Sequence, residues 1–122
     1  MIKLSNSQTV SISSGAIVAS GTYTTEAYDC HRTSGLFSLQ WLVTGDGTMK
    51  AEVLSSNDNV TYLDVNPDIT TAQTKSTGTS GANMTDFEVM PCNSFKIKFT
   101  ETGGASSIIV TAKLVTVTEE VR

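Results

Sequence analysis

The sequence predicts an all-β fold, a single antiparallel β-sandwich with jelly-roll-like connections, about 7–9 strands and no significant helix. Strand-like segments bounded by turn residues recur about every 8–12 residues, a spacing typical of sandwiches. Ser and Thr supply 34 of the 122 residues, and β-branched Thr suits the surface of a sheet. No segment of helical length shows the apolar period of a helix. The length suits one hydrophobic core, and we expect residues 1–122 to form one domain.

The composition argues against several classes of protein. Charged residues make up 16% of the chain and the net charge is −4, which does not suit a nucleic-acid-binding surface. The chain has no run of about 18 apolar residues, so we expect no membrane-spanning segment. Its first residues lead directly into strand-like alternation and not into an apolar signal-peptide run. We therefore expect the chain to be made and folded in the cytoplasm.

The first third of the chain predicts short strands. Residues 8–12 alternate and are closed by a turn at residues 13–15, and residues 16–30 read as two short strands or one strand bent at Gly21. The clearest strand follows. Phe37, Leu39, Trp41 and Val43 share one face of it, which predicts that all four, including the only Trp, belong to the core.

The middle of the chain predicts a meander of three strands. Gly45-Asp46-Gly47 is expected to join the strand at residues 37–44 to a strand at residues 48–55 as an antiparallel hairpin. A second turn at residues 56–59 leads to a third strand at residues 60–65. After Pro67 the chain becomes rich in Thr, Ser and Gly, and we expect a long crossover loop at about residues 67–86. Such a loop suits either a Greek-key crossover with a poorly ordered tip or an interaction arm.

The C-terminal part predicts strands at residues 87–90, 95–100 and 106–118. The last of them has apolar residues of both parities, odd-numbered at Ile109, Val115 and Val117 and even-numbered at residues 108–114. Either a bulge changes the register, or both faces of this strand are covered. In so small a domain, we expect another subunit to cover the second face of this strand. This predicts a homo-oligomer, either a trimer or a larger ring.

We assign no catalytic, cofactor-binding or metal-ligating residue, and expect no enzyme. The sole His, His31, follows Cys30 directly, so on a strand the two would face opposite sides, and residues 29–32 read as a polar turn. Asp residues favour turns, where they cap the backbone, and no core-facing carboxylate pair is visible. Those at turns or loop ends are Asp46, Asp58, Asp64, Asp68 and Asp86. A calcium site at residues 57–59 with Asp64 is a weaker alternative, because the spacing of an EF-hand is absent.

Two groups of side chains could bind ligands at the surface. Tyr23, Tyr28 and Tyr62 are expected to be partly exposed at a rim, and a glycan is the alternative partner that they suggest. Three lysines could form a small basic stripe on one sheet face, although solubility and protection of a sheet edge account for them better. They are Lys50, Lys96 and Lys98.

The two cysteines are expected to be free, half-buried thiols in a reducing compartment. Cys30, Trp41 and Cys92 are spaced much as in immunoglobulin domains, where a Trp packs on a disulfide between the sheets. The position of the tyrosine corner is Met90 here, and Pro91 interrupts the strand that would carry the second Cys. We therefore interpret the spacing as coincidence.

Residues 34–115 resemble small β-sandwich proteins encoded among bacteriophage structural genes. The resemblance lies in residues 34–41, in Thr44-Gly45-Asp46-Gly47-Thr48, and in residues 53–62, 95–104 and 108–114. These motifs are turns and alternating strands, so no functional residue is carried over. The resemblance implies a head-decoration, head-fibre or tail-associated protein that forms symmetric oligomers on a particle.

The leading functional hypothesis is therefore a non-enzymatic phage virion structural protein. Its location would be the virion, and its partners would be copies of itself and other virion proteins, with no nucleic acid and no membrane. The alternative is a carbohydrate- or receptor-binding β-sandwich module.

Overall fold

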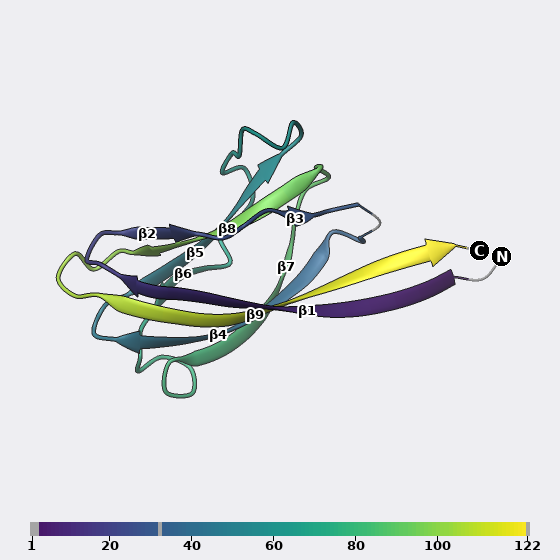
Figure 1. Cartoon of the computed structure of the whole chain (residues 1–122). Coiled ribbons are helices and arrows are strands. Elements are labelled where there is room, and N and C mark those ends of the chain that lie inside the picture. Colours follow the sequence, from purple (N-terminus) through teal and green to yellow (C-terminus); the bar gives the residue numbers. More distant parts are fainter. Residues whose placement is uncertain (1–2, 32, 122) are drawn as a thin grey trace.

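The computed structural model describes residues 3–31 and 33–121, and within them the chain forms two antiparallel β-sheets and no helix. Sheet A has the strand order β1-β9-β4-β7, and sheet B has the order β2-β8-β5-β6 with β3 beside β8. The two sheets pack as a sandwich (Figure 1), which confirms the predicted fold class. No helix among these residues could span a membrane. The strands are β1 (Lys3–Ile17), β2 (Thr22–Thr24), β3 (Tyr28–Asp29), β4 (Leu36–Gly45), β5 (Met49–Ser56), β6 (Thr70–Gln73), β7 (Ala82–Glu88), β8 (Ser94–Glu101) and β9 (Ile108–Val121).

β4 contributes the large residues that the sequence assigns to the core. Phe37, Leu39, Trp41 and Val43 alternate inward and are each at most 3% exposed, which confirms the predicted face. Phe37 packs against Phe95 of β8, with ring centroids 4.7 Å apart. A tilted aromatic pair of this kind adds about 0.5–1.5 kcal/mol beyond its burial. The contact therefore joins sheet A to sheet B within the core.

β9 keeps one register along its whole pairing with β4. Its even-numbered residues from 108 to 114 are buried, and its odd-numbered residues face outward. The irregularity lies instead in β1, which runs through the turn predicted at residues 13–15. There the register with β9 shifts between Ser13 and Ala16, and Ser14 Oγ accepts a hydrogen bond from the Val110 N–H (2.9 Å). A bulge between β9 and β4 therefore does not explain why β9 has apolar residues at both odd-numbered and even-numbered positions.

The turn after β4 does not form the predicted hairpin. β4 belongs to sheet A and β5 to sheet B, so residues 45–48 carry the chain from one sheet to the other. Gly45 permits this course because its φ is +92° and a Cβ there would lie 2.5 Å from the Ser107 carbonyl oxygen. A Gly-Asp-Gly sequence predicts a change of direction, but it does not specify the sheet that the next strand joins.

The predicted third strand at residues 60–65 is also wrong. Only Leu63 pairs with β5, through two backbone hydrogen bonds of 2.9 Å with Ser55. Asp58 turns the chain just before it, since its carboxylate accepts the N–H groups of Val60 (2.9 Å) and Thr61 (2.8 Å). These local side-chain bonds compete with a strand ladder. The neighbours of β5 in the sheet are β6 and β8, not a third meander strand.

The region predicted as a crossover loop at about residues 67–86 contains regular structure. β6 and the first residues of β7 lie inside it, which leaves residues 74–81 as the connection between them. Gln73 is 2% exposed, and its side-chain amide donates to the Thr77 hydroxyl (2.5 Å). The Gly81 N–H donates to the Thr77 carbonyl (2.8 Å). The Thr- and Ser-rich sequence here satisfies its own polar groups within a turn.

A buried carboxylate organises the end of the sandwich where the chain passes between sheets. Glu101, the last residue of β8, is 1% exposed and accepts four backbone N–H groups. Its Oε1 accepts those of Ser20 (3.1 Å) and Gly104 (2.7 Å), and its Oε2 those of Thr48 (2.8 Å) and Gly103 (2.7 Å). The donors belong to the β1–β2, β4–β5 and β8–β9 connections. One side chain therefore holds three connections together.

These hydrogen bonds make the stability of the fold depend on the ionisation of Glu101. The backbone N–H of Thr48, and then those of Gly104, Ser20 and Gly103, lower the pKa of Glu101 from 4.5 to about 2. Because the pKa is lower in the folded state, this contribution to stability is complete above pH 4.5 and is lost as the pH falls toward 2.

We predict that Glu101→Gln lowers Tm at pH 7 by roughly 10 °C, because the amide accepts less strongly and its NH2 group faces backbone donors. The difference from the wild type should shrink as the pH falls from 4.5 toward 2. Thermal unfolding followed by circular dichroism across this range measures both effects. Glu88→Gln, at an exposed position of β7, is the matched control and should change Tm little. An equal loss of Tm at every pH would contradict the role of the charge.

Candidate functional site

β1 and β9 continue past the rest of the sandwich as a two-stranded ribbon. The two strands pair along their whole lengths, whereas β4 accompanies β9 only as far as Val115. Beyond it, among the described residues, the bridge between Thr33 and Thr118 is the only backbone pairing of the ribbon with the body. Figure 1 shows the ribbon projecting from the sandwich. A two-stranded ribbon is marginally stable in water, so this one is suited to contact with a further chain.

The outer face of sheet A carries a patch of exposed apolar side chains. Leu42, Ile109 and Met84 are 42%, 46% and 64% exposed. The register places Leu42 of β4 diagonally beside Ile109 of β9 on one side and Met84 of β7 on the other. Val115, which is half-buried, lies further along the same face toward the ribbon. These four residues are called the sheet A patch, and apolar neighbours on three adjacent strands are suited to a protein contact.

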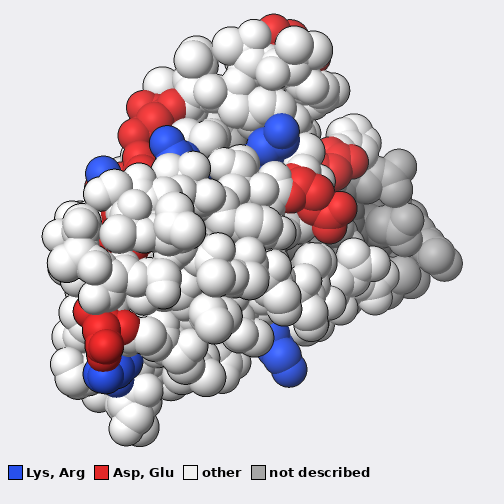
Figure 2. All heavy atoms as spheres, turned by 60° about the vertical axis from the view of Figure 1, so that its left-hand side comes forward, with Lys and Arg blue, Asp and Glu red and all other residues white. Residues whose placement is uncertain are grey.

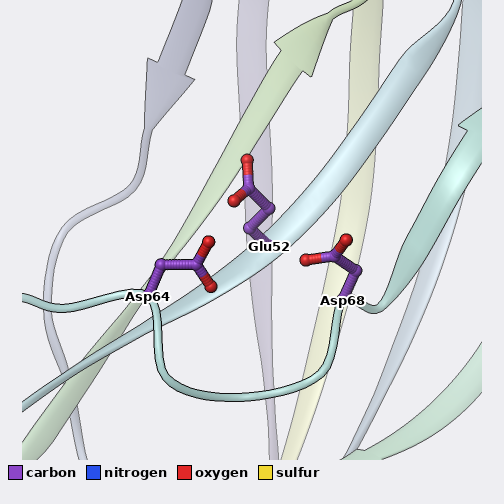
Figure 3. A group of neighbouring side chains, drawn as sticks. All are labelled: Glu52, Asp64 and Asp68. Carbon is purple, nitrogen blue, oxygen red and sulfur yellow. The ribbon is translucent and has the colours of Figure 1, made fainter.

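Three carboxylates meet over the outer face of sheet B (Figure 3). Glu52 projects from β5, and Asp64 and Asp68 come from the loop that follows, with one oxygen of each within 4.8 Å of the others. Lys50 Nζ lies 3.8 Å from Glu52 and 3.7 Å from Asp68. Burial raises the pKa of Glu52, which is 8% exposed, and a hydrogen bond with Asp64 raises it further. The four side chains form an ion-pair network in which Lys50 offsets part of the negative charge.

This carboxylate cluster differs from the calcium alternative that the sequence suggested. Asp58 uses its carboxylate to cap its own loop, and backbone N–H groups, that of Thr61 first, lower its pKa to about 2. Asp64 instead faces Glu52, which sequence reasoning did not single out. The sequence signal that could have identified Glu52 is its position two residues after Lys50, which places both charged side chains on the same face of β5. Carboxylate oxygens are ligands that Ca²⁺ and Mg²⁺ prefer, although here a lysine already accompanies them.

The described residues of the polar turn predicted at residues 29–32 are held by local hydrogen bonds. The Asp29 carboxylate accepts the His31 N–H (2.7 Å), and the Thr33 N–H donates to the Cys30 carbonyl (3.2 Å). Arg32, which was predicted within this turn, lies outside the described residues. The His31 side chain is exposed, and no hydrogen bond joins it to Cys30 among the described contacts.

Cys30 and Cys92 are half-buried thiols, and the fold brings them together. Their Sγ atoms lie 3.3 Å apart. Cys30 follows β3 and Cys92 precedes β8, so both flank sheet B. An immunoglobulin disulfide joins opposite sheets, and this pair does not. The structure therefore agrees with the interpretation of the immunoglobulin-like spacing as coincidence.

The three lysines of the predicted basic stripe lie on sheet B but are interleaved with other groups. Lys98 pairs in register with Glu52, Lys50 contacts the carboxylate cluster, and Lys96 Nζ lies 4.4 Å from the centre of the Tyr62 ring. Figure 2 shows acidic and basic atoms in small mixed groups on an otherwise uncharged surface, with no broad area of one sign on this face. The lysines are therefore better suited to ion pairing and solubility than to binding a polyanion.

The three tyrosines differ in their exposure. Tyr28 was expected to be partly exposed, but it is 8% exposed because it pairs with Phe95 across the edge of sheet B, with ring centroids 5.5 Å apart. The Tyr62 ring is covered by a lysine, and its hydroxyl shares a hydrogen bond with Ser94 Oγ (2.8 Å). Tyr23 is half-buried on β2. Burial of Tyr28 thus leaves Tyr23 and Tyr62, both half-buried, as the tyrosines that could contact a sugar.

Comparison with known proteins identifies the fold but no family. No protein-family model matches the sequence, and no curated protein matches it. Among solved structures, VP2 of infectious bursal disease virus, seen in a subviral particle, superposes with a TM-score of 0.57 and 11% identity over 92% of this chain and 32% of the VP2 chain. PliG of Aeromonas hydrophila, a periplasmic inhibitor of g-type lysozyme, gives 0.51 and 7% over 89% of this chain and 85% of its own. A protein of the disulfide-linked pili that form Bacillus endospore appendages gives 0.50 and 18% over 97% and 91%. These likenesses show a shared β-sandwich.

We predict that Glu52→Gln raises Tm by a few degrees at pH 7. The raised pKa of Glu52 means that its ionisation costs stability, so the free energy of unfolding falls as the pH rises above 4.5 and through the folded-state pKa. Gln has the shape of the protonated side chain and removes this cost. Below pH 4.5 the variant and the wild type should converge, as thermal unfolding at several pH values will show. A variant that is less stable at pH 7 would mean that the contact with Lys50 outweighs burial and repulsion.

Proposed function

We propose that this chain is a non-enzymatic structural protein of a bacteriophage particle and assembles there as a symmetric oligomer. The proposal includes one domain over residues 1–122, a location in the virion on a capsid or tail, and other virion proteins as partners. The observation that carries it is the combination of the projecting β1–β9 ribbon and the adjoining sheet A patch. Both present surface that this chain alone does not cover.

The geometry of the ribbon supports assembly by strand pairing or face packing. β1 is the edge strand of sheet A, and its outer edge has no neighbour among the described strands. A row of unpaired backbone groups on an edge strand is a template for another chain. The sheet A patch lies on the same sheet and extends toward the ribbon through Val115, so a second copy could contact both. Repetition of such contacts by symmetry sums weak interactions into a stable assembly.

The comparisons support the proposal only as far as the fold. A β-sandwich of this kind occurs in VP2 of a subviral particle and in the pili of endospore appendages, and also in a lysozyme inhibitor. The resemblance to small phage β-sandwich proteins supplies the link to a phage particle. Capsid or tail genes beside the gene for this chain would support the location, and a cluster of unrelated metabolic genes would count against it.

We predict that the purified chain has a mass in solution of three or more times 12.9 kDa, measured by light scattering after size exclusion. Leu42→Lys places a charge in the centre of the sheet A patch and should shift the mass toward that of the monomer. The side chain of Leu42 is on the outer face, so the monomer should remain folded by circular dichroism.

Val60→Lys is the matched control for this experiment. Val60 is 81% exposed, and it lies in the loop after β5, away from sheet A. This variant should keep the mass of the wild type. A wild-type chain that is monomeric at every concentration tested, or an oligomer that Leu42→Lys leaves intact, would contradict assembly through the sheet A patch.

A further inference from the structure

Two cysteines far apart in sequence lie in contact at one edge of sheet B. The Sγ atoms of Cys30 and Cys92 are 3.3 Å apart, and 62 residues separate the two positions. The backbone holds their segments side by side, because the Cys30 N–H donates to the Asn93 carbonyl (3.1 Å) next to the pairing of Asp29 with Ser94. The proximity of the sulfurs is therefore a consequence of sheet pairing.

We propose that Cys30 and Cys92 are a redox modification site, which closes to an intrachain disulfide when the folded protein meets a small-molecule disulfide. The sulfurs are already in contact, so a small side-chain movement brings them to bonding distance. This inference does not depend on the proposed function.

The pair is accessible to a small oxidant. Both side chains are half-buried, and together they line a surface hollow whose rim includes Met90, Pro91 and Val65. Cys92 also lines two neighbouring hollows, so it can be reached from more than one side. The hollows are open to solvent, so a small disulfide such as oxidised glutathione can approach the sulfurs.

The reaction proceeds by two exchanges. The thiolate of one cysteine attacks a sulfur of oxidised glutathione, forms a mixed disulfide and releases one glutathione thiolate. The second cysteine, as a thiolate, attacks the protein sulfur of the mixed disulfide and releases the second glutathione. Each cysteine gives up its proton to solvent. The two protein thiols lose two electrons in total, and these reduce one glutathione disulfide to two thiols.

The environment assigns different roles to the two thiols. Burial, and then the hydrogen bond with Cys92, raise the pKa of the Cys30 thiol to about 12. Cys92 lines three surface hollows, and Cys30 lines one of these three, so Cys92 is the more accessible sulfur and makes the first attack. Because the attacking species is the thiolate, closure should become faster as the pH rises from 7 toward 9.

The bond would close a long loop that contains β4, β5, β6 and β7. A crosslink across a loop of this length restricts the unfolded chain and raises Tm, by roughly 10 °C for a domain of this size. It would also fix the segment that holds Met90 and Pro91 against the turn after β3.

The test is oxidation of the folded wild-type chain by oxidised glutathione at pH 8, with dithiothreitol as the reduced state. We expect the titratable thiols to fall from two to none, the mass to fall by two hydrogen atoms, and Tm to rise. Under non-reducing conditions trypsin should release the peptide of residues 4–32 joined to the peptide of residues 76–96. The double variant Cys30→Ser, Cys92→Ser should show no change of Tm with oxidant.

Three outcomes would overturn the proposal. Both thiols could remain open to alkylation after oxidation, glutathione could stay attached as a mixed disulfide, or the crosslink could join two chains. Cys30→Ser alone should stop at the mixed disulfide on Cys92, and Cys92→Ser should react slowly or not at all. These readouts use thiol counts and masses, so they remain informative if a serine variant is less stable, and none of them depends on the oligomeric state.

Discussion

The carboxylate of Glu101 is the interaction on which the arrangement of the two sheets depends. Three connections of the chain meet at it, and each would otherwise leave backbone N–H groups without a partner in a crowded, partly buried place. Two neighbouring glycines pack closely against the same carboxylate. A Cβ on Gly47 would lie 2.9 Å from Glu101 Oε2, and one on Gly103 would lie 3.0 Å from it. The two glycine-containing turns are therefore parts of one structure, although 53 residues separate Thr48 from Glu101.

The sequence predicted the local periodicity of the strands well, but it did not predict which strands pair with one another. Alternation identified the inward face of β4, and the frequency of turns identified the sandwich, because both depend on residues close in the chain. The hairpin between β4 and β5 could not be judged from its turn, since the choice of sheet depends on β8 and β9, more than 40 residues later. Glu101 follows directly after the strand predicted at residues 95–100, and the sequence does not show its role for the same reason. Two of its donors, Ser20 and Thr48, lie in segments that only the folded chain brings near it.

Some surface features relevant to function could likewise be predicted from the sequence, and others could not. The apolar residues of both parities in β9 were visible in the sequence, and they do mark an outer face that the chain leaves partly apolar. The carboxylate cluster was not visible, because Glu52 meets Asp64 and Asp68 only after residues 57–69 fold back over β5. Tyr28 was misplaced because its burial depends on a two-residue strand, which is too short to give a periodic signal.

The pairing of β1 with β9 has a consequence for the order in which the fold forms. β1 has no other strand partner among the described residues, so sheet A cannot be completed until β9 has been synthesised. Non-local pairing of this kind slows folding and leaves the early strand unpaired in the meantime. The abundance of Ser and Thr in β1 then serves a kinetic purpose. A strand that must wait for its partner is less prone to aggregate when few of its side chains are apolar.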